Sequence, residues 1–412
     1  MIKDEIEDMV SVLKNEGKVH LAKAIGENWD KTLLEYSKEL NSYRPTLPME
    51  TVLKEAISQE LTRLDWSKDK ITEIINNLEK RRILNTYPHI TCAGKQRHLF
   101  IDWLASLSLS DDDFYSVAMF SGVPFSNKTR PGRICKKDEE INLMPSNMQD
   151  ELVYRNKIPA KMKEVSDSLP EKIRNLFPKT EIGHSYTKWA LQSSLNLEKS
   201  LLRGKPVFFD FNEVASNYFL LAIQDLTHPI SKMLFSQKER SLLIKHMSEV
   251  VFFYGSIQKD NHKEMENYYL RDGYIESESG KKIELTKEAI QKELETGLCP
   301  GMVIGFFIFA FMNQFQCFGS FAQIEYLPFY HDKFMQFEFL KEYKIDQSPA
   351  GALTTGGFKD NMDLNVFDLA LLDTKVAKDI LKKYEGTTFG EAILAIKDVL
   401  LHQNYSMNLV RK

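Results

Sequence analysis

A continuous apolar run at residues 114–120 is the feature that most constrains the fold of this chain. The run reads Phe-Tyr-Ser-Val-Ala-Met-Phe and follows three aspartates at 111–113, a pattern that predicts a buried strand. The residues before it predict a short strand at 83–87, a polar turn, and a helix at 95–107. A strand, a helix and a second strand in this order form a βαβ unit, so we expect a parallel sheet.

The same alternation of strand and helix returns further along the chain. Residues 207–211 predict a second buried strand, and residues 212–224 predict the helix that follows it. Short hairpins are predicted at 134–143 and at 274–285, the latter around Ser279-Gly280.

Both ends of the chain carry apolar residues at helical spacing, through the first ~80 residues and again from Thr286 onward. We therefore expect an α/β protein with a helical N-terminal region (1–82) packed on a mostly parallel sheet core with small hairpins (83–255). A hairpin and a helix-rich C-terminal third (256–412) complete it. The length of 412 residues agrees with two or three domains of ~150 residues each.

Composition excludes several classes of protein. A net charge of −4 provides no basic field for nucleic acid. The four cysteines form no Cys-x-x-Cys pair, which argues against a zinc ribbon and favours a reducing compartment. The N-terminus lacks the features of a signal peptide, and the apolar run at 302–312 is shorter than the roughly 18 residues of a membrane-spanning helix. We expect a cytoplasmic protein with no nucleic-acid or membrane partner, in which residues 302–312 form a buried helix.

The loop at 121–133 is the first candidate for a binding site, because it follows a buried strand, where ligands of open α/β sheets lie. It gathers hydroxyl, amide, lysine and arginine side chains, and an arginine fork can bind a carboxylate or a phosphate with two hydrogen bonds. The alternative is a solvated basic loop whose arginines pair with surface carboxylates. The residues expected to bind substrate are Ser126, Asn127, Arg130 and Arg133.

The loop at 88–98 lies between the first predicted strand and its helix, where backbone amides attract anions. His89 and His98 are candidates for proton transfer, and Lys95 adds positive charge. The sequence His-Ile-Thr-Cys at 89–92 is loosely similar to the His-Ile-Gly-His loop of class I aminoacyl-tRNA synthetases, which implies a nucleotide phosphate site. It departs from that loop at Thr91 and Cys92, and no lysine-rich companion motif is present, so the chain is not assigned to the family. Alternatively, both histidines are structural.

Two further segments carry candidate residues. Asp210 ends the strand at 207–211 and Glu213 opens the next helix, where a carboxylate could bind a hydroxyl, an amine or a metal, or simply cap the helix. Gln323 and Glu325 are polar residues beside a predicted core helix, so they line a pocket or form an internal hydrogen-bond network. No His-Glu-x-x-His pattern occurs, and no metal site is predicted.

These residues suggest an enzyme that acts on an anionic small molecule by group transfer or ligation, with ATP or another nucleotide as a candidate cofactor. The predicted catalytic residues are His89, His98, Asp210 and Glu213. The alternative is a non-catalytic binding or regulatory protein whose polar loops contact another protein. The reaction type, the use of a nucleotide and the formation of a homo-oligomer are left open by the sequence. The Gly- and Thr-rich segment at 349–361 resembles a ligand-contacting loop.

Overall fold

A parallel four-stranded sheet forms the centre of the molecule. The computed structural model describes residues 2–137, 139–343, 345, 352–359 and 364–402. The strands of the sheet, in spatial order, are β11 (Gln316–Phe318), β1 (Ile83–Asn85), β2 (Phe114–Met119) and β5 (Lys205–Asp210). Each neighbouring pair is parallel, and β2 is buried along its whole length, as the apolar run predicts. The predicted α/β fold is confirmed.

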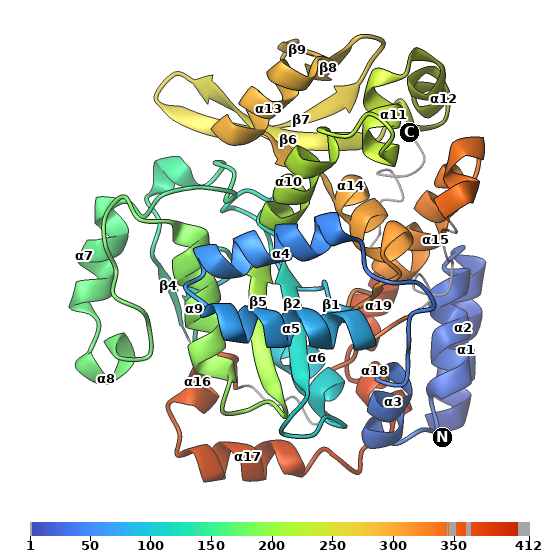
Figure 1. Ribbon diagram of the computed structural model, residues 1–412. Helices are drawn as coiled ribbons and strands as arrows, with labels where there is room; N and C mark the ends of the chain where they lie inside the picture. Colours follow the sequence, from blue (N-terminus) through green and yellow to red (C-terminus); the bar gives the residue numbers. More distant parts are fainter. Residues whose placement is uncertain (1, 138, 344, 346–351, 360–363, 403–412) are drawn as a thin grey trace.

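Helices cover both faces of this sheet (Figure 1). One face packs against helices of the N-terminal region, of which α4 contacts β5 and α5 contacts β2. The other face carries α6 and α9, which are linked through α16. The helices of the N-terminal region are α1 (Ile2–Asn15), α2 (Val19–Asn28), α3 (Leu33–Leu40), α4 (Thr51–Arg63) and α5 (Lys68–Arg81).

The middle and the end of the chain supply the other helices, and few of them exceed three turns. The middle part contains α6 (Gln96–Ser106), α7 (Ala160–Ser168), α8 (Glu171–Arg174), α9 (Tyr186–Glu198), α10 (Phe211–Ala222), α11 (Pro229–Phe235) and α12 (Gln237–Met247), with a 3-10 turn at Ser146–Met148. The last part contains α13 (Lys287–Thr296), α14 (Met302–Phe306), α15 (Gln323–Phe334), α16 (Val366–Ala370), α17 (Thr374–Lys382), α18 (Phe389–Leu394) and α19 (Lys397–His402), with a 3-10 turn at Glu338–Tyr343.

A second sheet, which is antiparallel, lies above the carboxyl ends of the parallel strands in Figure 1. Its order is β10 (Cys299–Pro300), β6 (Val251–Lys259), β7 (His262–Leu270), β8 (Tyr274–Ser277) and β9 (Lys282–Glu284). The predicted hairpin at 274–285 is its outer edge, and the predicted boundary at residue 255 falls within β6. The separate hairpin at 134–143 is also present, as β3 (Arg133–Cys135) and β4 (Glu140–Asn142).

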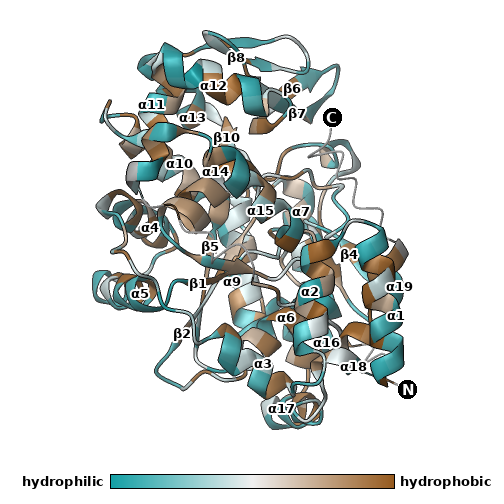
Figure 2. Cartoon of the chain, turned by 90° about the vertical axis from the view of Figure 1, so that its right-hand side faces the viewer, coloured by the Kyte–Doolittle hydropathy of each residue, from teal (hydrophilic) through white to brown (hydrophobic). Residues whose placement is uncertain are grey.

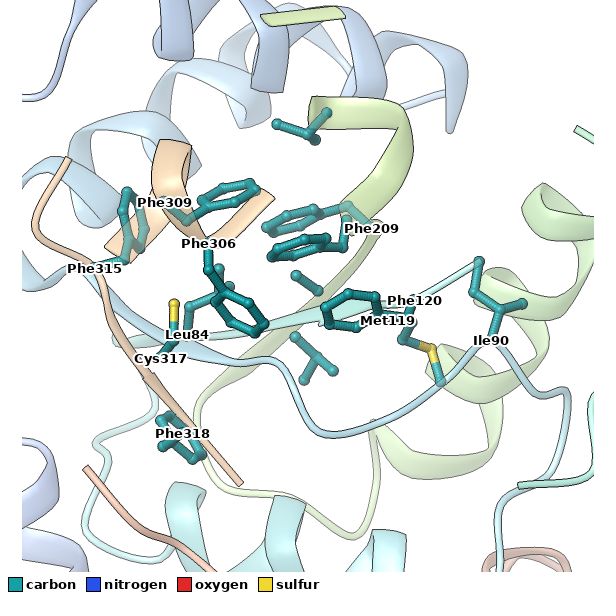
Figure 3. Packing of buried hydrophobic residues seen from close by; sticks show 14 of the residues in the cluster. Leu84, Ile90, Met119, Phe120, Phe209, Phe306, Phe309, Phe315, Cys317 and Phe318 are labelled. Carbon is teal, nitrogen blue, oxygen red and sulfur yellow. The ribbon is translucent and has the colours of Figure 1, made fainter. Parts of the chain in front are cut away.

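Aromatic rings fill the space between the central sheet and the segment that follows β10 (Figure 3). Phe120 and Phe211 stack with ring centroids 4.2 Å apart, and Phe309 stacks on Phe211 at 4.9 Å. Gly305 is required for this packing, because an added Cβ would lie 1.9 Å from Cε1 of Phe211. The predicted buried helix at 302–312 is confirmed, as α14 followed by a π-helical turn at Phe307–Met312. In Figure 2, α14 is brown beside α10 and β5, and the outer helices carry most of the teal residues.

The side chain of Asn212 joins the two sheets at the start of α10. Its Oδ1 accepts hydrogen bonds from the backbone amides of Ser121 (2.9 Å) and Gly122 (3.0 Å). Its Nδ2 donates to the carbonyl oxygen of Pro300, 2.9 Å away. Asn212 is fully buried, so each of these bonds replaces a bond to water. The carboxyl end of β5 is thereby fixed against the second sheet.

Within the described part of the chain, no helix is long and apolar enough to cross a bilayer. Residues 352–358 of the Gly- and Thr-rich segment are buried without regular secondary structure and pack against α6, where Gly356 lies beside Phe100. The other residues of that predicted loop, apart from Lys359, lie outside the described residues.

Candidate functional site

A cavity of about 670 Å³ opens beside the carboxyl end of β5. Its walls come from the end of α4, the starts of α9 and α10, the end of α13, and the loops at 155–158 and 178–185. In open α/β sheets, ligands bind outside the carboxyl ends of the strands, so this cavity has the expected position. We call it the cationic cavity, because five basic side chains line it: Arg63, Arg155, Lys157, Lys179 and Lys188.

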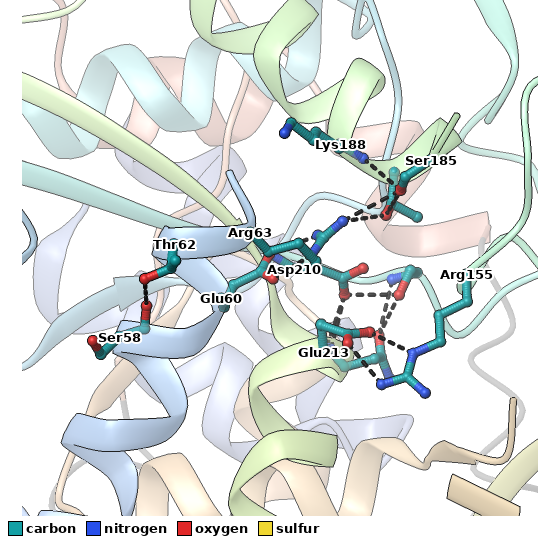
Figure 4. Close-up of polar contacts among 12 residues, drawn as sticks. Ser58, Glu60, Thr62, Arg63, Arg155, Ser185, Lys188, Asp210 and Glu213 are labelled. Atoms are coloured by element: carbon teal, nitrogen blue, oxygen red, sulfur yellow. Dashed lines mark hydrogen bonds and ion pairs between the residues drawn. The ribbon is translucent and has the colours of Figure 1, made fainter. Parts of the chain in front are cut away.

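The first turn of α9 forms one wall of the cationic cavity. Ser185 caps this helix, with its Oγ accepting a hydrogen bond from the amide of Lys188 at 3.3 Å. The guanidinium of Arg63 reaches the same turn, where Nη1 donates to Ser185 Oγ at 3.3 Å (Figure 4). A helix N-terminus carries a partial positive charge, so the helix and Arg63 together favour an anion here.

Two arginine–carboxylate pairs lie beneath this wall. Arg63 donates from Nε and Nη2 to both oxygens of Glu60, at 2.6 and 2.8 Å. Arg155 binds Glu213 in the same two-fold manner, at 3.0 and 2.7 Å, and also donates from Nη1 to the carbonyl oxygen of Leu294. These bidentate pairs fix both guanidinium groups at the cavity wall.

Asp210 lies between the two pairs and is almost completely buried. Its Oδ1 accepts hydrogen bonds from Ser121 Oγ (2.7 Å) and from the amide of Asn212 (2.9 Å), so it caps α10. Its Oδ2 has no hydrogen-bond partner among the described residues. Burial, together with the negative charge of Glu60, raises the pKa of Asp210 to about 7. A group with a pKa of about 7 is partly protonated near neutral pH, and it becomes negatively charged as the pH rises further.

The lysines of the cavity differ from the arginines in how they are paired. Lys188 lies 2.6 Å from Asp65, and Lys179 lies 2.8 Å from Glu181, and both carboxylates are solvent-exposed. Exposed pairs of this kind contribute only about 0–1 kcal/mol, so an anionic ligand can replace them. Lys157 has no ion-pair or hydrogen-bond partner for its ammonium group within the described chain. The lysines are thus available to a ligand, while the arginines shape the wall.

Of the predicted catalytic residues, Asp210 and Glu213 lie at this site, and Glu213 lines the cationic cavity. His89 and His98 lie elsewhere, near the carboxyl end of β1. His89 Nδ1 is 3.1 Å from both Asn127 Oδ1 and Thr129 Oγ1, and burial lowers its pKa. Burial, with the charge of nearby basic groups, lowers the pKa of His98 to about 3, so its ring is neutral at physiological pH.

The predicted anion-binding loop brings its basic residues together, as the turn at Pro131-Gly132 suggests. Arg133 Nη1 lies 3.1 Å, Arg130 Nε 3.5 Å and Lys95 Nζ 3.4 Å from the carboxylate of Glu140 on β4. Although burial acts in the opposite direction, these cations hold the pKa of Glu140 below its ordinary value. The partner observed for the two arginines is therefore a carboxylate of the chain itself. This pairing agrees with the alternative considered above, and the R130A variant discussed below tests whether the loop also contacts a ligand.

The other predicted substrate-binding residues are separate from the cationic cavity. Ser126 Oγ donates to Asp150 at 3.1 Å. Gln323 is fully buried and accepts a hydrogen bond from Thr86 Oγ1 at 3.0 Å. Glu325 accepts from the backbone amide of Leu21 at 2.8 Å, and burial raises its pKa. Gln323 and Glu325 thus form internal hydrogen bonds, as expected from the second of the two alternatives, an internal hydrogen-bond network.

Sequence reasoning missed most of the cavity's side chains. For Glu60 a signal was present, because it falls one turn after Ala56 on the buried face of α4, and a carboxylate in a core position needs a cationic partner. Arg63 follows it by three residues, the spacing of a helical ion pair. The residues at 155–158 and 178–185 lie in irregular loops, where periodicity provides no guide. Within the described residues, no group of three or more His, Cys, Asp or Glu side chains could hold a metal ion.

Comparisons of the chain with protein-family models, with curated proteins and with solved structures found no match.

Proposed function

We propose that this protein is an enzyme that binds an anionic small molecule, a carboxylate or a phosphate ester, in the cationic cavity. The observation that carries the proposal is the convergence of the α9 N-terminus with Arg63, Arg155, Lys157 and Lys188 on one cavity. Its volume, about 670 Å³, falls within the range of about 300–1,000 Å³ typical of small-molecule sites. The position outside the carboxyl end of β5 supports the same conclusion.

The proposed chemistry is proton transfer that accompanies group transfer or ligation. His184 lines the cavity and is largely exposed, and histidine is the side chain that most often acts as a general acid or base in enzymes. Asp210 lies behind Glu213 and sets the charge of the site through its own proton. A nucleotide is one ligand of the proposed class, because its phosphates suit a helix N-terminus flanked by arginine and lysine.

A specific observation favours the non-catalytic alternative, a protein that binds the anion without converting it. The carboxylate of Glu213, which lines the cavity, is held in a bidentate pair by Arg155. Such a pair occupies both carboxylate oxygens, so neither is free to bind the ligand. The two candidates share one ligand site and differ in whether the ligand is changed.

A thermal-shift screen with phosphate esters, nucleotides and carboxylates tests the proposal. A ligand at 100 times its Kd adds about 2.7 kcal/mol to the free energy of unfolding, which gives a readily measured rise in Tm. Ligands that raise Tm are then incubated with the protein and analysed by mass spectrometry. Conversion supports the enzyme, and binding without conversion supports the alternative. If neutral analogues raise Tm as much as their anionic counterparts, both are refuted.

A further inference from the structure

A second cavity, of about 430 Å³, adjoins the cationic cavity. Arg155, Lys157 and Thr296 line both, so the two spaces meet across these three side chains. The second cavity extends away from the parallel sheet, toward strands β6 and β7. We call it the tyrosine cavity, because Tyr154 and Tyr268 form part of its wall.

The wall of the tyrosine cavity is a fixed surface. The hydroxyl of Tyr268 donates to Glu266 Oε1 at 2.8 Å, and the other oxygen of Glu266 accepts from Ser279 Oγ at 2.7 Å. The ring of Tyr268 lies directly on Gly255 of β6, where an added Cβ would be 2.6 Å from Cε2. Gly255 therefore permits the close packing that holds the ring in place.

In the tyrosine cavity, more basic than acidic side chains lack an ion-pair partner. Lys281 is paired with Glu293 at 2.8 Å, whereas Glu151 accepts a hydrogen bond from the neutral amide of Asn156 and has no ion-pair partner among the described residues. Lys263 on β7 has no ion-pair or hydrogen-bond partner for its ammonium group among the described residues. Lys157, at the junction, has none either, so two unpaired ammonium groups line the tyrosine cavity, one of them shared with the cationic cavity.

We propose that the two cavities bind one elongated molecule that carries an anionic group at each end. One group lies at the start of α9 beside Lys188, and the other lies beside Lys263, with Lys157 between them. This inference rests on the proposed function, since it assigns the first anionic group to the cationic cavity. It adds a substrate class: bisphosphates, or other molecules with two anionic groups joined by a neutral spacer.

A length series of synthetic anions tests this inference. The probes are the α,ω-diphosphonates of ethane, hexane and decane, each compared with the alkyl monophosphonate of equal chain length, by isothermal titration calorimetry. Two anionic groups on one spacer gain affinity when the spacer matches the distance between the sites. We expect one diphosphonate to bind about 10-fold more tightly than its monophosphonate, the effect of one charge-assisted contact inside a cavity.

Two variants assign the contacts. K263A should remove that advantage and leave the affinity for the monophosphonate within about two-fold of the wild type. K259A is the matched control, because Lys259 is an exposed lysine of the same sheet that does not line either cavity. K188A should lower the affinity for the monophosphonate and for the diphosphonate alike.

The outcomes separate the inference from the proposed function. If the monophosphonate binds and depends on Lys188, but no diphosphonate binds more tightly, the two-site ligand is refuted and the cationic cavity stands. The same holds if K263A and K259A behave identically. If the monophosphonate does not bind, or binds K188A as well as the wild type, the proposed function itself is refuted.

Discussion

Replacing Asp210 with asparagine should stabilise the protein, and the gain should grow as the pH rises. The substitution keeps the shape of the side chain and an oxygen that can cap α10, since asparagine is also a favoured N-cap. It removes a carboxyl group that is 1% exposed and whose Oδ2 has no partner among the described residues. Above neutral pH the wild-type protein has to bury this group as an anion, and D210N does not.

The magnitude follows from the pKa of Asp210. The folded protein raises this pKa from 3.8 to about 7. Between these two values the folded state keeps a proton that the unfolded chain has lost, so this group's contribution to stability falls as the pH rises and is constant above pH 7. At about 1.4 kcal/mol per pH unit, the wild type loses up to ~4 kcal/mol over this window. D210N should therefore gain up to ~4 kcal/mol relative to the wild type by about pH 8, and little at about pH 4.

The assay is urea unfolding, followed by tryptophan fluorescence, at several pH values between about 4 and 8. The buried groups Asp102 and Glu198, whose pKa values are also raised by burial, titrate in both proteins and cancel in the difference. D373N is the matched control, because it makes the same change at the exposed N-cap of α17. A stability difference between D210N and the wild type that does not vary with pH would refute the reasoning.

Three further predictions concern the fold and the predicted basic loop. G305A should lower the free energy of unfolding by about 1–3 kcal/mol, because the new methyl group collides with Phe211, while G26A, in open space on α2, should not lower it. N212A should lower the free energy of unfolding by about 3 kcal/mol, because two amides and a carbonyl lose buried hydrogen bonds. Urea unfolding measures the effects of G305A and N212A, and unchanged stability would contradict these two predictions. R130A should leave phosphate affinity within about two-fold, because its observed partner is Glu140; a larger loss by calorimetry would place this loop in the ligand site.

The central sheet could be predicted from the sequence because its strands are buried on both faces. A run such as that of β2 can lie only inside the protein, and α5, which packs on it, has its buried residues Ile71, Ile74 and Leu78 at helical spacing. Of the second sheet only the hairpin at 274–285 was predicted, because strands such as β7 are mixed in polarity, with the charged residues Lys263, Glu264 and Glu266 among them. Strand β11 has three residues and is parallel to β1, more than 200 positions away, so no local pattern marks it.

The candidate site could be predicted only where it coincides with a strand end. Asp210 and Glu213 were found because they terminate β5 and open α10. Arg63 on α4 and Arg155 in the 155–158 loop lie far apart in the sequence and both precede β5, and only the packing of α4 and of this loop against α10 brings them together. Conversely, Arg130 and Arg133 formed the most prominent basic motif in the sequence, yet a carboxylate seven to ten positions away pairs with both.

The affinity of K188A for a simple phosphorylated probe tests the proposed anion site most directly. Calorimetry with pyrophosphate compares the wild type, K188A and K199A, whose lysine lies at the opposite end of the same helix, α9. The account predicts that K188A binds pyrophosphate about 10-fold more weakly and that K199A binds within about two-fold of the wild type. Equal affinity in all three proteins, with the fold intact by circular dichroism, would contradict it.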